Sequence, residues 1–186
     1  PSITALDDAA TRIAGAKRRR KEPLIVIEMS TLPIADKERA EGILRKAGGV
    51  MLDCPISGTA ARMKERSWSI YVSGPTAECE RADPILAVFA DLRHYVGPFG
   101  HGTKMKLVAN HLVAIYNVAY GESMTFARKM GLNAKRVYEL MANSPVLVTG
   151  VFKLRGAQMV KRQYTPATMK IDVWQKDMQV IGDMAK

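Results

Sequence analysis

The sequence predicts an α/β region with a mainly parallel sheet, followed by a region that is helical throughout. Short apolar runs of strand length alternate with helical patterns up to about residue 96, an order typical of βαβ units. Beyond Gly102 only the helical spacing of apolar residues continues. We therefore expect two parts, residues 1–96 and residues 97–186, in a chain of 186 residues that is long enough to bury a core.

The first part is expected to contain short strands that end in polar or glycine-rich turns. Leu24-Ile25-Val26-Ile27 is a continuous apolar run that suits a strand buried on both faces. Further strands are expected at 50–52, 68–72 and 92–96, and helices at 4–20, 34–47 and 78–90, the last split or kinked by Pro84. Residues 60–66 are expected to be irregular. Ligands of parallel sheets collect at the carboxyl ends of strands, which here carry Ser30-Thr31 and Ser57-Gly58-Thr59.

The second part opens with a long helix expected from Thr103 to about Met130. Thr103 suits an N-terminal cap, and Gly100 and Gly102 before it allow a tight turn or a close backbone approach. Apolar residues lie on almost every side of this helix, which predicts burial all round. Further helices are expected at 133–143, 151–161 and 167–186, the last one opened by Thr165-Pro166.

The formal net charge of +10 is concentrated partly in the basic run at residues 17–21. Such a run can bind nucleic acid or an acidic surface. A solvated helix end is the favoured interpretation, because no interleaved aromatic residues or nucleic-acid motif accompany the run, and nucleic acid is not an expected partner. The positive balance also suits an anionic substrate or a phosphorylated cofactor.

The two cysteines, Cys54 and Cys79, and the three histidines show no metal-ligand spacing, so no metal site is expected. Free thiols are typical of a reducing cytoplasm. No apolar run approaches membrane-spanning length and no secretory signal opens the chain, so we expect a cytoplasmic location and no membrane partner. Because the chain starts at Pro1 in the middle of a pattern, we expect a fragment.

Lys106 and Asn110 form an unusual polar pair on the long apolar helix. They are one turn apart and share a face. In the simplest interpretation the lysine extends to solvent and the asparagine satisfies a backbone group. In the alternative, burial lowers the pKa of the lysine so that it transfers a proton, while the two strand-end turns bind a carboxylate. That set of groups suits the oxidation of a hydroxy acid, although the sequence contains no G-x-G-x-x-G turn.

Four motifs in order resemble those of the β-hydroxyacid dehydrogenases. This family includes 3-hydroxyisobutyrate dehydrogenase, tartronate semialdehyde reductase and, more distantly, 6-phosphogluconate dehydrogenase. The resemblance covers nearly the whole chain and rests on Ser30-Thr31-Leu32-Pro33, Asp53-Cys54-Pro55-Ile56-Ser57-Gly58, Gly100-His101-Gly102 with Lys106 and Asn110, and Lys176-Asp177-Met178.

The resemblance implies that residues 1–96 are the second part of a Rossmann-type dinucleotide-binding domain and that 97–186 are an incomplete helical domain for substrate binding and dimerisation. It implies that Lys106 is the general acid/base and that Asn110, Ser57, Gly58 and Thr59 bind a small β-hydroxy acid. Thr31 and Lys176 would contact the cofactor, NAD or NADP. The family also implies a homodimer or homotetramer.

The chain departs from the family pattern at several places. Thr59 stands where the family has a second glycine, and the βαβ half that carries the glycine fingerprint is not in the sequence. Two alternatives therefore stay open: a catalytically silent domain that binds nucleic acid or a protein through its basic surface, and an inactive truncated product. Lys104 lies near the same turn as Lys106, but its spacing from Gly102 does not match the family.

Overall fold

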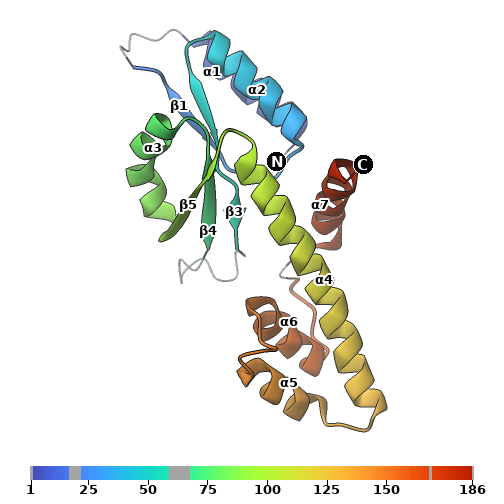
Figure 1. Ribbon diagram of the computed structural model, residues 1–186. Helices are drawn as coiled ribbons and strands as arrows, with labels where there is room; N and C mark the ends of the chain where they lie inside the picture. The colour runs from blue at the N-terminus through green and yellow to red at the C-terminus, as the bar shows by residue number, and fades with distance from the viewer. Residues whose placement is uncertain (1, 17–21, 59–67, 168, 186) are drawn as a thin grey trace. The chain divides into compact units, whose positions relative to one another are not determined.

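The computed structural model describes residues 2–16, 22–58, 68–167 and 169–185, and it divides into two compact units. The first unit comprises Pro1–Val108 and Lys176–Lys186, and the second comprises Ala109–Gln175. The basic run at 17–21, Thr59 and the stretch 60–66 lie outside the described residues. The predicted fold class, an α/β part followed by a helical part, is confirmed (Figure 1).

The first unit is built on a five-stranded sheet in the order β1-β2-β4-β3, with β5 paired to β4. Its strands are β1 (Ile25–Glu28), β2 (Val50–Asp53), β3 (Ile56–Ser57), β4 (Ser69–Ser73) and β5 (Leu92–Gly97). The β1–β2 and β4–β5 pairs are parallel, whereas β4 runs antiparallel to both β2 and β3. The two longest ladders are therefore parallel, as predicted, whereas the antiparallel pairing of β4 with β2 and β3 was not predicted. The link from Ser57 to Ser69 is shorter than the dozen or more residues that a parallel crossover needs.

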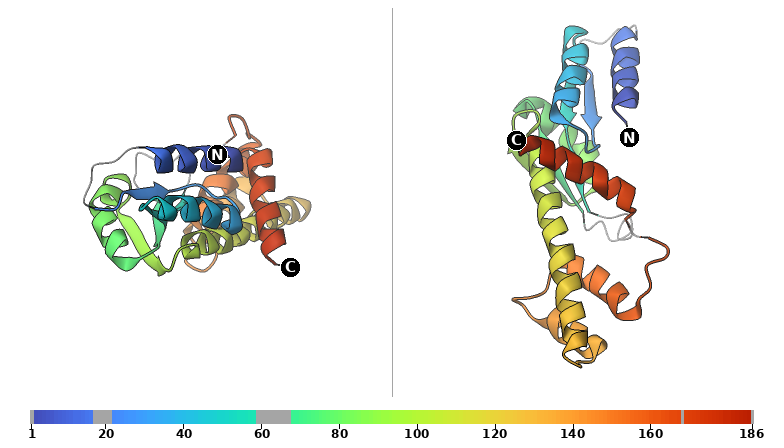
Figure 2. Two further views of the ribbon diagram at one scale, coloured as in Figure 1. Left: turned by 90° about the horizontal axis from the view of Figure 1, so that it is seen from above. Right: turned by 90° about the vertical axis from the view of Figure 1, so that its right-hand side faces the viewer.

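Helices cover both faces of this sheet: α1 (Ile3–Gly15) and α2 (Ile34–Lys46) on one, α3 (Thr76–Phe89) on the other. The alternation of side chains along β2 explains the two layers, because Met51 packs under α1 and α2 while Leu52 packs under α3. Figure 2 shows α1 lying beside α2. Helix α1 ends at Gly15, earlier than predicted, and α3 is one helix that Pro84 does not split.

The second unit is helical and has a small aromatic core. It contains most of α4 (His101–Lys129), then α5 (Ala134–Asn143), α6 (Gly150–Lys161) and the start of α7 (Ile171–Met184). Tyr120 and Met124 of α4 pack against Phe152 of α6, with the Tyr120 and Phe152 ring centroids 4.4 Å apart. Side-chain oxygens of Asn133 and Thr149 cap α5 and α6, as their residue types favour.

Two predictions about these helices are wrong. Helix α4 is not buried all round: Val108, Ile115 and Val118 are 62%, 49% and 61% exposed, because α5 and α6 pack on one side only. Helix α7 starts at Ile171 rather than at residue 167, since its first helical hydrogen bond runs from the Trp174 N–H to the Lys170 carbonyl. No helix in the described part of the chain is long and apolar enough to span a membrane.

Candidate active site

The last residues of four strands lie side by side and form the base of the candidate site. Glu28 pairs in register with Asp53, Asp53 with Ser73, and Ser73 with Gly97. The ends of β1, β2, β4 and β5 are therefore neighbours, although the sheet is mixed. The polar side chains of Glu28, Asp53 and Ser73 therefore collect at this place.

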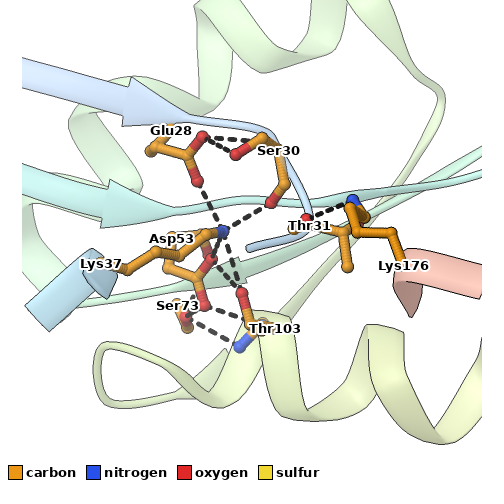
Figure 3. Close-up of polar contacts among 9 residues, drawn as sticks. Glu28, Ser30, Thr31, Lys37, Asp53, Ser73, Thr103 and Lys176 are labelled. Atoms are coloured by element: carbon orange, nitrogen blue, oxygen red, sulfur yellow. Dashed lines mark hydrogen bonds and ion pairs between the residues drawn. The ribbon is translucent and has the colours of Figure 1, made fainter. Parts of the chain in front are cut away.

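The side chain of Lys37 joins these strand ends (Figure 3). Its Nζ lies 2.5 Å from Glu28 Oε2 and 2.7 Å from Asp53 Oδ1. It also donates to the carbonyl oxygen of Ser30 at 2.6 Å and to Thr103 Oγ1 at 2.9 Å. One ammonium thus connects the turn after β1, the end of β2 and the start of α4. Lys37 and Asp53 are both 0% exposed, so this ion pair lies in the interior of the unit.

Lys37 was not among the predicted site residues, although its position in α2 gives a signal. The buried residues of this helix recur at spacings of three or four, on one face: Ile34, Lys37, Ala40 and Leu44. A lysine within an apolar stripe is either extended to solvent or paired in the interior. Its two carboxylate partners come from neighbouring strands, and this long-range pairing was not visible in the sequence.

Asp53 and Ser73 hold the amino-terminal end of α4. The Thr103 N–H donates to Asp53 Oδ2 at 2.7 Å, and the Gly102 N–H donates to Ser73 Oγ at 2.9 Å. A carboxylate at a helix amino terminus interacts favourably with the helix dipole as well as with the N–H group. Thr103 is therefore not the N-terminal cap that the sequence predicted: α4 starts at His101, and the side chains that bind its first N–H groups come from the sheet.

Gly102 allows α4 to approach the sheet this closely. A Cβ at this position would lie 2.5 Å from the Asp53 carbonyl oxygen and 2.6 Å from that of Tyr71. These distances are shorter than any ordinary van der Waals contact, and both neighbours are backbone atoms. The predicted close backbone approach at Gly102 is thus present, and it sets the distance between the strand ends and the helix that carries Lys106.

Lys106 and Lys104 have different surroundings at the start of α4. Lys106 is partly buried, whereas Lys104 is exposed. Burial lowers the pKa of Lys106; nearby Asp177 opposes the shift, and nearby Lys176 adds to it. A lysine whose neutral form is favoured can accept a proton more readily near neutral pH. The structure thus places Lys106 in surroundings that disfavour its charged form.

Thr31 and Lys176, predicted to contact a cofactor, lie together. Lys176 Nζ donates to the Thr31 carbonyl oxygen at 2.7 Å (Figure 3). It also lies 3.1 Å from Asp177 Oδ1. An ammonium has three N–H donors, so these two contacts leave one for a ligand. The Lys176 side chain thus joins the turn after β1 to α7.

The remaining predicted residues lie on α4 and at the end of β3. Asn110 is one turn beyond Lys106 on α4 and is 5% exposed. Ser57 ends β3 and pairs with Ser69, the first residue of β4, whereas Asp53 pairs with the last. Gly58 follows in close contact with Trp68, since a Cβ on Gly58 would lie 2.5 Å from Trp68 Cβ. Thr59 lies outside the described residues.

Other chemistry receives little support from the described residues. Both cysteines are buried free thiols, and desolvation raises the pKa of Cys54 to about 12 and that of Cys79 to about 11. Such thiols are protonated at neutral pH and are poor nucleophiles. Across the described ranges, no group of three His, Cys, Asp or Glu side chains is placed to hold a metal ion.

Both parts of the chain match models of dinucleotide-binding families. Residues 2–97 match the NAD binding domain of 6-phosphogluconate dehydrogenase. Residues 100–186 match the family described as NAD-binding of NADP-dependent 3-hydroxyisobutyrate dehydrogenase. The two matches together extend over nearly the whole chain.

Individual proteins show the same similarity. The chain is 28% identical over 173 residues to L-threonate dehydrogenase of Haemophilus influenzae, covering 92% of this chain and 57% of that protein. It is 30% identical over 162 residues to 2-hydroxy-3-oxopropionate reductase of Escherichia coli, covering 87% and 54%. A 3-hydroxyisobutyrate dehydrogenase structure from Salmonella typhimurium matches with a TM-score of 0.78 at 25% identity, covering 87% and 56%. The chain thus spans about half the length of these relatives.

Proposed function

This chain belongs to the β-hydroxyacid dehydrogenase family, as its motifs predicted, and we propose that it carries part of the active site of an NAD(P)-dependent oxidoreductase. Its substrate would be a small β-hydroxy acid. The observation that carries the proposal is the position of Lys106, partly buried and with a lowered pKa, near Lys176 and Asp177.

The family supports NAD or NADP as the cofactor class, since both matching models describe nicotinamide-dinucleotide-binding domains. In the proposal, Thr31 and Lys176 hold the cofactor through the Thr31 hydroxyl and the remaining Lys176 donor. The bound cofactor supplies the hydride acceptor or donor.

Lys106 is the proposed general acid/base. In the oxidative direction its neutral Nζ accepts the proton of the substrate hydroxyl while the carbon loses hydride. In the reductive direction the ammonium returns that proton to the new alkoxide oxygen. Desolvation favours the neutral amine, which brings the pKa of Lys106 closer to neutral pH.

Asn110, Ser57, Gly58 and Thr59 are the proposed substrate-binding residues. Asn110 is on the same helix face as Lys106, so its amide can orient the hydroxyl that Lys106 deprotonates. Ser57 and Gly58 belong to the motif that implied carboxylate binding. The proposed assembly is a homodimer or homotetramer, and the exposed apolar side chains of α4 support association through the helical unit.

The experiment uses the full-length protein. It is titrated with NADH and NADPH by nicotinamide fluorescence and then assayed by nicotinamide absorbance on a panel of small β-hydroxy acids. We expect both binding and turnover. Absence of both would contradict the proposed function and favour a silent domain. Steep salt-dependent binding to DNA that is lost on neutralising residues 17–21 would establish that alternative.

Two lysine variants test the assignment of the proton-transfer residue. Lys106→Ala is expected to lower turnover by about 10²–10⁴-fold, the usual contribution of general acid/base catalysis. Lys104→Ala is the matched control, because Lys104 is exposed and lies two residues earlier on the same helix. Equal losses from the two variants would show that the wrong lysine has been assigned.

A further inference from the structure

We propose that a pocket within the second unit binds a small organic anion that carries a hydroxyl group. The pocket has a volume of about 660 Å³, and its walls come from α4, α6, the segment that leads into α7 and the first turn of α7. Its polar lining residues include Asn117, Arg155, Lys170 and Asp172. None of the residues in the proposed oxidoreductase site lines it, so the proposal stands independently of that function.

Arg155 is the main reason to expect an anion. Its side chain is partly buried, and desolvation lowers its pKa, but among the described residues no carboxylate forms an ion pair with it. A guanidinium that loses water without gaining an anionic partner is costly, and a carboxylate or phosphate can bind it through two parallel hydrogen bonds. Lys170 adds a second cation to the lining and Asp172 a single acid, so the charged lining residues sum to a positive charge.

The Arg155 guanidinium lies over the indole ring of Trp174. The guanidinium carbon lies 5.9 Å from the centroid of the indole ring, within the range of a cation–π contact. This contact leaves the edge of the guanidinium, where its N–H donors lie, available to a ligand. Met159, Tyr164 and Ile171 also line the pocket and provide apolar surface for the carbon skeleton of a small molecule.

Asn117 accounts for the hydroxyl group in the proposed ligand. It lines the pocket, and its buried Oδ1 accepts no hydrogen bond from the described part of the protein. A buried amide oxygen without a donor costs free energy, which a ligand hydroxyl would recover. An anion with a nearby hydroxyl therefore satisfies both Arg155 and Asn117, and the volume falls within the range of small-molecule sites.

Tryptophan fluorescence can report binding at this pocket directly. The chain has two tryptophans, Trp68 and Trp174, so Trp68→Phe leaves the pocket residue as the sole reporter. This variant is titrated with L-malate at constant ionic strength, and succinate serves as the matched compound that lacks the hydroxyl. We expect a saturable change with malate and weaker binding of succinate. A linear response to malate would overturn the proposal, and equal affinities would overturn the role of Asn117.

Variants then locate the binding site. Arg155→Gln is expected to weaken malate binding about tenfold or more, whereas Arg155→Lys, which keeps the charge, should weaken it less. The control is Arg136→Gln on α5, because Arg136 is exposed in the same unit and does not line the pocket. Unchanged binding in Arg155→Gln would overturn the proposal. If Arg155→Gln does not fold, Lys170→Gln at the rim provides the same test, with weaker binding expected and unchanged binding contradicting the site.

A further comparison separates this pocket from the oxidoreductase site. Lys106→Ala should remove turnover but leave the Trp174 response to malate unchanged, because Lys106 does not line the pocket. Loss of the malate response in Lys106→Ala would show that the fluorescence reports the oxidoreductase site instead. A malate response without nicotinamide binding would contradict the proposed function and leave the pocket proposal supported.

Discussion

Replacing Lys37 by methionine should destabilise the first unit strongly, because Lys37 neutralises two carboxylates inside it. Its Nζ lies within 2.5–2.9 Å of four oxygens, and two of these belong to Glu28 and Asp53. Methionine preserves most of the side-chain volume but leaves both carboxylates without their cation. Removing one partner of a buried ion pair costs about 3–5 kcal/mol. For a chain of this size, the loss corresponds to a midpoint lower by about 6–20 °C.

Thermal and urea denaturation followed by circular dichroism measure this change. The control is Lys46→Met, since Lys46 is an exposed lysine on the same helix and its replacement should change stability by less than about 0.5 kcal/mol. Adding Asp53→Asn to Lys37→Met should cost less than the sum of the single changes, by about 0.5–3 kcal/mol, because the two residues are in contact. A Lys37→Met loss no larger than that of Lys46→Met would refute the structural role of Lys37.

Three further predictions concern packing and burial. Gly102→Ala should cost about 1–3 kcal/mol of stability, because the new Cβ would meet backbone oxygens at 2.5–2.6 Å. The control is Gly121→Ala on the same helix, where a Cβ has open space and should raise stability by up to about 1 kcal/mol. Denaturation of both variants measures the difference. Cys54 and Cys79 should react with a thiol reagent at neutral pH only after denaturation, since burial raises their pKa values to about 12 and 11; fast reaction in the native protein would contradict this. Lys106→Met should raise the thermal midpoint at neutral pH, because the folded state disfavours the lysine charge. This gain should vanish as pH rises towards the ordinary lysine pKa of 10.5, where the unfolded chain also loses the proton; a gain independent of pH would contradict it.

The sequence predicted local structure better than long-range pairing. Helices α2, α5 and α6 lie within a few residues of their predicted ranges, because apolar spacing and capping residues are local signals. The direction of β4 was not predicted, because the direction in which two strands pair depends on the length of their connection as well as on their apolar pattern. The exposed side of α4 could not be predicted either. Apolar residues on every side of a helix favour burial, but they do not show whether other parts of this chain pack against each side.

The same difference between local and long-range features holds for the residues of the candidate site. The motifs pointed to Lys106, Thr31 and Lys176, and the structure brings these residues to one region of the first unit. The residues that fix α4 there were missed or misassigned. Thr103 was expected to cap α4 because its residue type favours a cap, but Asp53, fifty residues away in the sequence, binds its N–H group. The sequence therefore identified candidates for the chemistry, while the contacts that position them depended on the fold.

The position of Lys106 follows from contacts made at the other end of the same helical turn. Asp53 and Ser73 bind the N–H groups of Thr103 and Gly102, so both the height and the rotation of α4 are fixed at its first turn. A helix advances 100° per residue, so the rotation that places Lys106 in a partly buried position leaves Lys104, two residues earlier, exposed. A one-residue shift of that anchor would move Lys106 by 100° around the axis and change its burial. The burial that lowers the pKa of Lys106 therefore depends on the rotation of α4 that Asp53 and Ser73 fix.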